Sequence, residues 1–356
     1  MARPPALDPP ARSVGRIGLI PPRRAAALLA VACGLAMAAG TAPALADSPL
    51  GAVAAVGRLR AHVGVARGIV ATVDGGRTWR LERYTSHRVH EVQFPTAKIG
   101  FALSRRGVLA TRDGGAHWAH RGLRTTLAEV DFLGARVGWG LARTAGGLQV
   151  VRTRDGGRTW KARGEQAHSV CFTTGAVGWI GKGRKVLFTD DGGATWQLQF
   201  TLAHRAEEAV VHCTRGGSVW ALFTDGAATS HQAYAVYASF DGGAHWLPEL
   251  AQFIHTPHKV PRIDDYPGPF DVVSATVEKF LGLCVACGRG RPSLTATATH
   301  GRVWVHRRMS APRGVGDYAL MFVDRRRGWV AEANGRTTRI VHTGDAGVTW
   351  TLQYLG

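Results

Sequence analysis

Beyond residue 46 the sequence lacks any apolar run long enough to cross a membrane, so we expect no transmembrane span once the leader is removed. The sequence is also poor in acidic residues, with 25 Asp and Glu against 44 Lys and Arg, and only six of the basic residues are lysines. The resulting formal net charge of +19 favours an anionic partner, because a field of this sign concentrates negatively charged ligands. A genome that prefers arginine codons would produce the same composition.

The first 46 residues have the pattern of an export signal. A basic leader that ends at Arg23 and Arg24 precedes an apolar run over residues 25–40, and Ala44 and Ala46 form the small-x-small pattern expected before a cleavage site. We therefore expect residues 1–46 to be a signal peptide and residues 47–356 to form an exported domain, whether secreted, periplasmic or held at the cell surface. An uncleaved signal-anchor is the alternative.

One short string recurs along the rest of the chain. Its pattern is Ser/Thr-x-Asp-Gly/Ala-Gly-x-x-Trp, where x is any residue. The aspartates are Asp74, Asp113, Asp155, Asp191, Asp241 and Asp345. A seventh copy, at residues 297–304, has Thr299 in place of the aspartate. The tryptophans are Trp79, Trp118, Trp160, Trp196, Trp246, Trp304 and Trp350.

These strings predict a repeated sheet with a tight turn at each copy. An Asp in a turn accepts hydrogen bonds from following backbone N–H groups, glycine permits positive φ, and Trp can fill the space between neighbouring sheets. Apolar pairs and Gly-aromatic steps lie between most copies, so each unit is expected to hold four short strands. The sequence therefore predicts an all-β fold, a seven-bladed β-propeller of four-stranded antiparallel blades. The first blade has only residues 47–71 ahead of its string, and we expect it to contain three compressed strands or to borrow a strand from the C-terminus.

The strings resemble the Asp-box, or bacterial neuraminidase, repeat. Between the strings lie an apolar pair, such as Val130 and Phe132, and a Gly-Trp pair, such as Gly138 and Trp139. With these pairs, the strings resemble the photosystem II assembly and stability-factor propellers and their non-photosynthetic relatives. That resemblance covers essentially all of residues 47–356. It implies a non-enzymatic binding or assembly role, with no catalytic residues and no cofactor, and we expect a monomer.

The alternative is a glycoside hydrolase of the same repeat class, similar to the sialidases. Those enzymes carry an Arg-Ile-Pro motif ahead of the first box, whereas this sequence has only Arg67, Gly68 and Ile69 there. All eleven tryptophans are assigned to the strings or to the Gly-aromatic steps, so none is left as a platform for sugar stacking. We therefore do not expect sialidase chemistry.

Basic residues are concentrated in the expected turns between the second and third strands of the blades. Such turns share one face of a propeller with the connections between blades, where ligands usually bind. The candidate residues are Arg105, Arg106, Lys182, Arg184, Lys185, Arg289, Arg291 and Arg336. They predict a cationic face for an unknown protein or an anionic cell-envelope polymer, and we do not expect nucleic acid as a partner. The alternative is a set of scattered, solvated arginines, because residues 325–327 carry arginines on the opposite face.

The longest connection, residues 252–269, follows the fifth string. It carries His255, His258, Asp264, Asp265 and Tyr266, which are the residue types of a metal site or a general acid/base set. Their spacing matches no metal-binding motif, so we predict an ordinary structural loop without a metal, and a metal or acid/base site is the alternative.

Four cysteines lie beyond the leader. Cys213 aligns with the Phe of the other first strands and Cys171 lies one residue before its own Phe, so their side chains point to opposite faces of neighbouring blades. This arrangement permits a disulfide between blades 4 and 5, and the alternative is a pair of buried thiols. Cys284 and Cys287 form a CxxC motif that suits a local disulfide or half a metal site.

Overall fold

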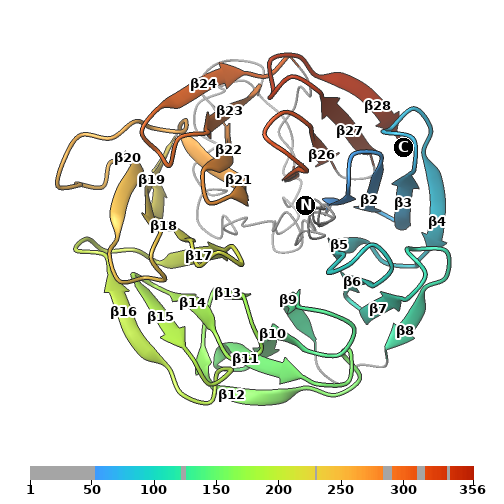
Figure 1. Ribbon diagram of the computed structural model, residues 1–356, viewed down its shortest axis with the longest axis horizontal. Helices are drawn as coiled ribbons and strands as arrows, with labels where there is room; N and C mark the ends of the chain where they lie inside the picture. The colour runs from blue at the N-terminus through green and yellow to red at the C-terminus, as the bar shows by residue number, and fades with distance from the viewer. Residues whose placement is uncertain (1–52, 122–125, 229–230, 284–290, 311–316, 335–336) are drawn as a thin grey trace, which may run out of the picture.

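Seven four-stranded antiparallel sheets arranged around a central axis form the protein in this computed structural model, which describes residues 53–121, 126–228, 231–283, 291–310, 317–334 and 337–356 (Figure 1). The predicted all-β, seven-bladed propeller is therefore confirmed. Residues 1–52, which include the expected signal peptide, lie outside the described residues. Among the residues that are described, no helix is long and apolar enough to cross a membrane.

Each blade uses four consecutive strands, with the first nearest the axis and the fourth at the rim (Figure 1). Blades 1 to 4 consist of β1 (Val53–Val56), β2 (Arg60–Val65), β3 (Gly68–Thr72), β4 (Arg80–Tyr84), β5 (Val89–Gln93), β6 (Gly100–Ser104), β7 (Gly107–Thr111), β8 (Ala119–Arg121), β9 (Leu127–Phe132), β10 (Gly138–Thr144), β11 (Gly147–Thr153), β12 (Lys161–Gln166), β13 (Ser169–Phe172), β14 (Gly178–Lys182), β15 (Lys185–Thr189) and β16 (Gln197–Thr201).

Blades 5 to 7 consist of β17 (Glu208–Cys213), β18 (Val219–Ala228), β19 (His231–Ser239), β20 (Leu247–Gln252), β21 (Tyr266–Ser274), β22 (Val277–Leu283), β23 (Pro292–Thr297), β24 (Trp304–Arg308), β25 (Asp317–Phe322), β26 (Gly328–Asn334), β27 (Thr337–Thr343) and β28 (Thr351–Leu355). The turns between second and third strands lie on one face, with the connections between blades. We call this the front face, and the face that bears the other turns the back face.

Three short strands precede the turn of the first blade, and its fourth strand follows that turn. Its sheet is complete, in the order β1-β2-β3-β4, and no strand comes from the C-terminus. Gly57, with φ of 73°, allows a tight turn from β1 into β2. Blades 7 and 1 are joined by side chains: Gln353 Nε2 donates to the Gly75 carbonyl over 2.9 Å, and the Ala55 N–H points at the Met321 sulfur over 2.9 Å.

The core consists of one apolar cluster at each of the seven joints between blades. At the joint between blades 3 and 4, Trp139 stacks on Phe172 with ring centroids 3.6 Å apart, and Trp196 meets the same ring edge-on at 6.1 Å. Glycine opens space for this phenylalanine, because a Cβ on Gly178 would collide with its ring. Every string tryptophan packs into one of these clusters, and Trp304 does so between blades 5 and 6.

Polar side chains of the first strands also tie neighbouring blades together, a feature that the sequence patterns did not reveal. Asp131 accepts the Phe172 N–H over 2.6 Å, and Gln93 accepts the Phe132 N–H over 2.7 Å. These buried acceptors satisfy backbone groups of the next blade, which would otherwise lose a hydrogen bond on burial. The inner ring is therefore held by hydrogen bonds as well as by apolar packing.

The aspartate turns are held by a repeated hydrogen-bond pattern. In blade 3, Asp155 accepts from the Thr159 N–H over 2.9 Å and from the Thr159 hydroxyl over 2.6 Å, while Thr153 Oγ1 accepts the Gly157 N–H over 3.0 Å. Together with the Thr153 hydroxyl, these donors outweigh burial and lower the pKa of Asp155 to about 2. In blade 6, the Thr299 hydroxyl accepts the Val303 N–H over 2.8 Å and so replaces part of this pattern. These turns lie on the back face.

Candidate functional site

The predicted basic residues that the structure describes lie on the front face. Arg105 and Arg106 form the turn between β6 and β7, and Lys182, Arg184 and Lys185 surround the turn between β14 and β15. All five side chains are exposed. Arg291 lies just before β23, whereas Arg289 and Arg336 fall outside the described residues.

Several of these cations have partners within the chain. Lys182 Nζ lies 2.7 Å from Glu165, Arg106 donates to His87 over 3.1 Å, and Arg184 donates to the Leu202 carbonyl over 3.4 Å. The field of the face is nevertheless positive near blades 2 and 3. There, burial together with Arg143 and Arg105 lowers the pKa of His90 to about 4.

Acidic groups on the same face are paired with arginines. Asp317 at the start of β25 lies 4.0 Å from Arg88 of the connection before β5, and burial raises the pKa of Asp317 to about 6 against the opposing pull of that arginine. Glu207 and Asp225 both lie within 3.3 Å of Arg205. Beside them, burial and the neighbouring Glu207 raise the pKa of Glu208 to about 7, so the face is not uniformly cationic.

The long connection before blade 6 separates the residues that the sequence grouped together. Asp264 is fixed to β23, because Ser293 Oγ donates to its carboxylate over 2.9 Å. The Asp265 carbonyl accepts the Gln232 N–H over 2.8 Å, and Tyr266 begins β21.

The two histidines of this connection lie in different surroundings. The His255 ring lies 6.0 Å from the His204 ring, whereas His258 lines a cavity. In the part of the chain that the structure describes, no three His, Cys, Asp or Glu side chains come together as a metal site would require.

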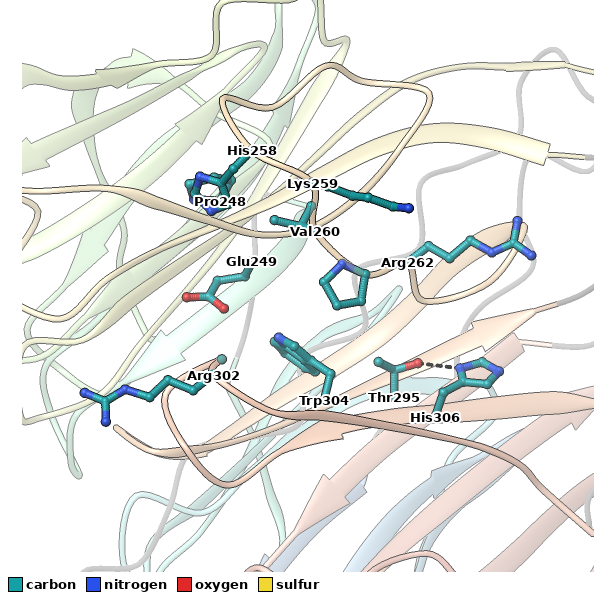
Figure 2. A pocket seen from close by; sticks show the side chains of 12 residues that line it. Pro248, Glu249, His258, Lys259, Val260, Arg262, Thr295, Arg302, Trp304 and His306 are labelled. Carbon is teal, nitrogen blue, oxygen red and sulfur yellow. Dashed lines mark hydrogen bonds between the residues drawn. The ribbon is translucent and has the colours of Figure 1, made fainter.

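That cavity has a volume of about 330 Å³ and lies between blades 5 and 6 (Figure 2). One wall comes from β20 and the long connection, and the other comes from β23, β24 and the turn between them. The lining residues are Pro248, Glu249, His258, Lys259, Val260, Pro261, Arg262, Thr295, Gly301, Arg302, Trp304 and His306. Figure 2 shows the Trp304 indole in the middle of the gap, with the Arg302 and Arg262 guanidinium groups extending away at its two ends.

Glu249 is the carboxylate of this cavity. Burial raises the pKa of Glu249 to about 7. The sequence patterns missed Glu249, although a signal was available: it stands three residues after Trp246, where blades 4 and 7 carry Gln199 and Gln353. The patterns also did not anticipate that a string tryptophan, Trp304, would line a cavity.

Cys171 of β13 and Cys213 of β17 form a disulfide between blades 4 and 5, with their Cα atoms 5.9 Å apart. The bond lies in the apolar cluster of that joint, at the position where other blades place the phenylalanine of the stack. Cys284 and Cys287 lie outside the described residues.

No family model matches the sequence, and no curated protein matches it. Among solved structures, the chain is similar to YCF48 bound to D1 peptide, with a TM-score of 0.51 and 17% identity over 82% of this chain and 86% of that one. It is also similar to an ancestral GH74 enzyme, with a TM-score of 0.56 and 14% identity over 98% of this chain and 47% of that one. The chain thus spans about half the length of that enzyme. Likeness at these identities establishes the propeller fold.

Proposed function

We propose that the protein is an exported, non-enzymatic scaffold that binds an acidic segment of a partner protein on its front face. The observation that carries this proposal is the group of exposed cations Arg105, Arg106, Arg184 and Lys185 on the turns of blades 2 and 4. An acidic segment would gain from this positive field both in encounter rate and in orientation. The similar fold of YCF48 bound to D1 peptide supports a peptide-binding role.

The alternative, a glycoside hydrolase of the Asp-box class, is supported by the likeness to an ancestral GH74 enzyme in fold alone. Glycoside hydrolysis normally takes two carboxyl groups, one on each side of the scissile bond. In the cavity between blades 5 and 6, Glu249 is the single carboxylate among the lining residues. This geometry favours binding over hydrolysis.

The test compares two charge-matched double variants in binding to a fluorescent oligoglutamate peptide, followed by anisotropy at several salt concentrations. Arg105→Ala with Lys185→Ala should weaken binding by roughly fivefold to tenfold, because exposed charges contribute up to about 1 kcal/mol each. Arg325→Ala with Arg326→Ala removes the same charge from the back face and should leave binding unchanged.

An equal loss of affinity in both double variants would show that binding depends on the total charge of the protein and not on the front face, and would refute the proposal. Preference for an anionic polysaccharide over the peptide would identify an envelope polymer as the partner instead. Release of reducing sugar from that polysaccharide would favour the hydrolase.

A further inference from the structure

A glutamine links neighbouring blades at two joints in the same way. At the joint between blades 4 and 5, the Trp179 indole N–H donates to Gln199 Oε1 over 2.7 Å, and Gln199 Nε2 donates to the Gly242 carbonyl of the next aspartate turn over 2.9 Å. One amide therefore accepts from the tryptophan of its own blade and donates to the following blade. This double role needs a group that is donor and acceptor at once.

The joint between blades 7 and 1 repeats this link. Trp329 donates to Gln353 Oε1 over 3.1 Å, and Gln353 Nε2 donates to the Gly75 carbonyl over 2.9 Å. In both cases the glutamine is the third residue after the tryptophan that follows the turn of its own blade. Its amide fills the space beside a glycine in the turn of the next blade: Gln199 lies against Gly243, and Gln353 lies against Gly76. The position, and not only the residue type, is therefore conserved between the two joints of this chain.

Blade 5 has Glu249 at this position. Its carboxyl group lies against Gly301 of the blade 6 turn, as the amides of Gln199 and Gln353 lie against their glycines. A carboxylate has two acceptors and no donor, so only the protonated acid reproduces the pattern of the amide. The Trp220 indole N–H, which corresponds to that of Trp179, is buried and has no hydrogen-bond partner among the described residues. The link is thus incomplete with Glu249 as it stands.

A second buried acid faces the same joint. Glu278 of β22 pairs with Thr297 of β23. The equivalent position, opposite the first Thr of the string, is Gly178 in blade 4 and Gly328 in blade 7. The Glu278 side chain is fully buried, and neither carboxyl oxygen has a hydrogen-bond partner within the described chain. Because Phe280, two residues along β22, packs into the cluster between blades 5 and 6, Glu278 points toward blade 5 as well.

We infer that the joint between blades 5 and 6 is a proton-controlled latch, in which Glu249 replaces the linking glutamine and holds blade 5 to the blade 6 turn only while it carries a proton. Loss of that proton removes the donor and places a negative charge near Glu278 in a buried site. The walls of the cavity in Figure 2 come from these same two blades, so loosening of the joint alters the cavity.

The charges around the joint agree with this assignment. Burial raises the pKa of Glu249 to about 7. Burial and the neighbouring Glu249 raise the pKa of Glu278 to about 9, although Lys279 opposes this. The other ionisable groups that face Glu249 are spread over the long connection, β24 and its turn, and they are His258, Lys259, Arg262, Arg302 and His306. All five are exposed, so solvent screens their charges.

The direction of the pH effect follows from the proton count. When the joint opens, Glu249 meets water and its pKa returns toward the ordinary value of about 4.5. Opening therefore releases a proton between pH 4.5 and about 7, and the equilibrium constant for opening rises by up to about tenfold per pH unit in this window. Above about pH 7, Glu249 is ionised in both states and its contribution levels off.

The experiment is hydrogen exchange of the purified full chain at pH 5, 6 and 7, followed by mass spectrometry and corrected for the intrinsic pH dependence of amide exchange. In the natural sequence, peptides from β20 and from the turn before β24 should lose protection by at least tenfold between pH 5 and pH 7. The equivalent peptides around Gln199 and Gln353 serve as controls in the same molecule and should keep their protection. Equal behaviour at all three joints would overturn the latch.

Two substitutions sharpen the result. Glu249→Gln supplies the donor at every pH and should reduce the pH dependence at the joint between blades 5 and 6 to the share that Glu278 contributes. Gln353→Glu should transfer a pH dependence to the joint between blades 7 and 1. Unchanged pH dependence in Glu249→Gln, or no new dependence in a folded Gln353→Glu variant, would contradict the proposal.

Discussion

The joints between blades 3 and 4 and between blades 5 and 6 occupy equivalent places in the ring and are built from different chemistry. The first joint has a stack of Trp139, Phe172 and Trp196, with Asp131 capping a backbone N–H of the next blade. In blade 6, Val272 stands where blade 4 has Phe172, and Glu278 stands where it has glycine.

This difference shows which part of the repeat the fold requires. Strand order is the same in the two blades, although blade 6 lacks the phenylalanine, the glycine and the turn aspartate and its β21–β22 pairing contains register shifts that blade 4 does not have. Each sheet needs a filled joint, but the filling need not be the same at every joint. Blade 6 therefore keeps its place while carrying, at the position where blade 4 has Gly178, the buried carboxyl group of Glu278.

The largest effect is expected from the aromatic stack. Phe172→Ala should lower the free energy of unfolding by about 3–5 kcal/mol, because it removes a buried ring and leaves a cavity between two sheets. Val272→Ala, at the equivalent position of blade 6, should cost about 1–2 kcal/mol since fewer atoms are removed. Urea denaturation of both variants measures the difference, and equal losses would show that the two joints depend on this position to the same extent.

Removal of the disulfide should have the next largest effect. The Cys171–Cys213 bond closes a loop with a sequence separation of 42 residues. Its loss in the Cys171→Ala, Cys213→Ala double variant should cost about 2–4 kcal/mol, chiefly through the greater freedom of the unfolded chain. Thermal unfolding with and without reductant checks this: reductant should lower the melting temperature of the natural protein and leave the double variant unchanged. A natural protein indifferent to reductant would contradict the expectation, provided that thiol titration shows the bond to be reduced.

The smallest effect is expected at the turns. Asp155→Ala should lower the free energy of unfolding at neutral pH by about 1 kcal/mol, because it removes an acceptor for the Thr159 N–H and hydroxyl. Since the pKa of Asp155 is lowered to about 2, its contribution is present above the ordinary pKa and is lost as the pH falls toward 2.

Thr299→Asp in blade 6 makes the opposite change and should stabilise the protein by a similar or smaller amount. Chemical denaturation at pH 7 and pH 3 compares the two variants. A stabilised Asp155→Ala variant would show that the turn does not depend on its carboxylate.

Much of the fold was predictable because its determinants are local. The turn aspartates and the Trp that follows each turn are visible as a repeated string, and seven strings require seven sheets. The seventh string was recognised without its aspartate, because Thr297, Gly301 and Trp304 kept their spacing.

The site was predictable only in part, because its contacts join blades that are distant in sequence. Turn positions placed Arg105 and Lys185 on one face, but did not show that Lys182 is paired with Glu165. Residue types grouped His258 with Asp264, whereas the backbone directs these side chains to different partners. Glu249 and Glu278 become meaningful only when each is compared with its equivalent in other blades.

The completeness of blade 1 has a consequence for how such rings change over generations. In a ring whose last sheet is assembled from both ends of the chain, a duplicated or deleted segment leaves a broken sheet at the seam. Here β1 to β4 and β25 to β28 are each whole sheets, and the seam between them is made of side chains. We therefore expect that duplication or deletion of a whole blade would leave every remaining sheet complete, with only the side-chain contacts at the new seam to be rebuilt.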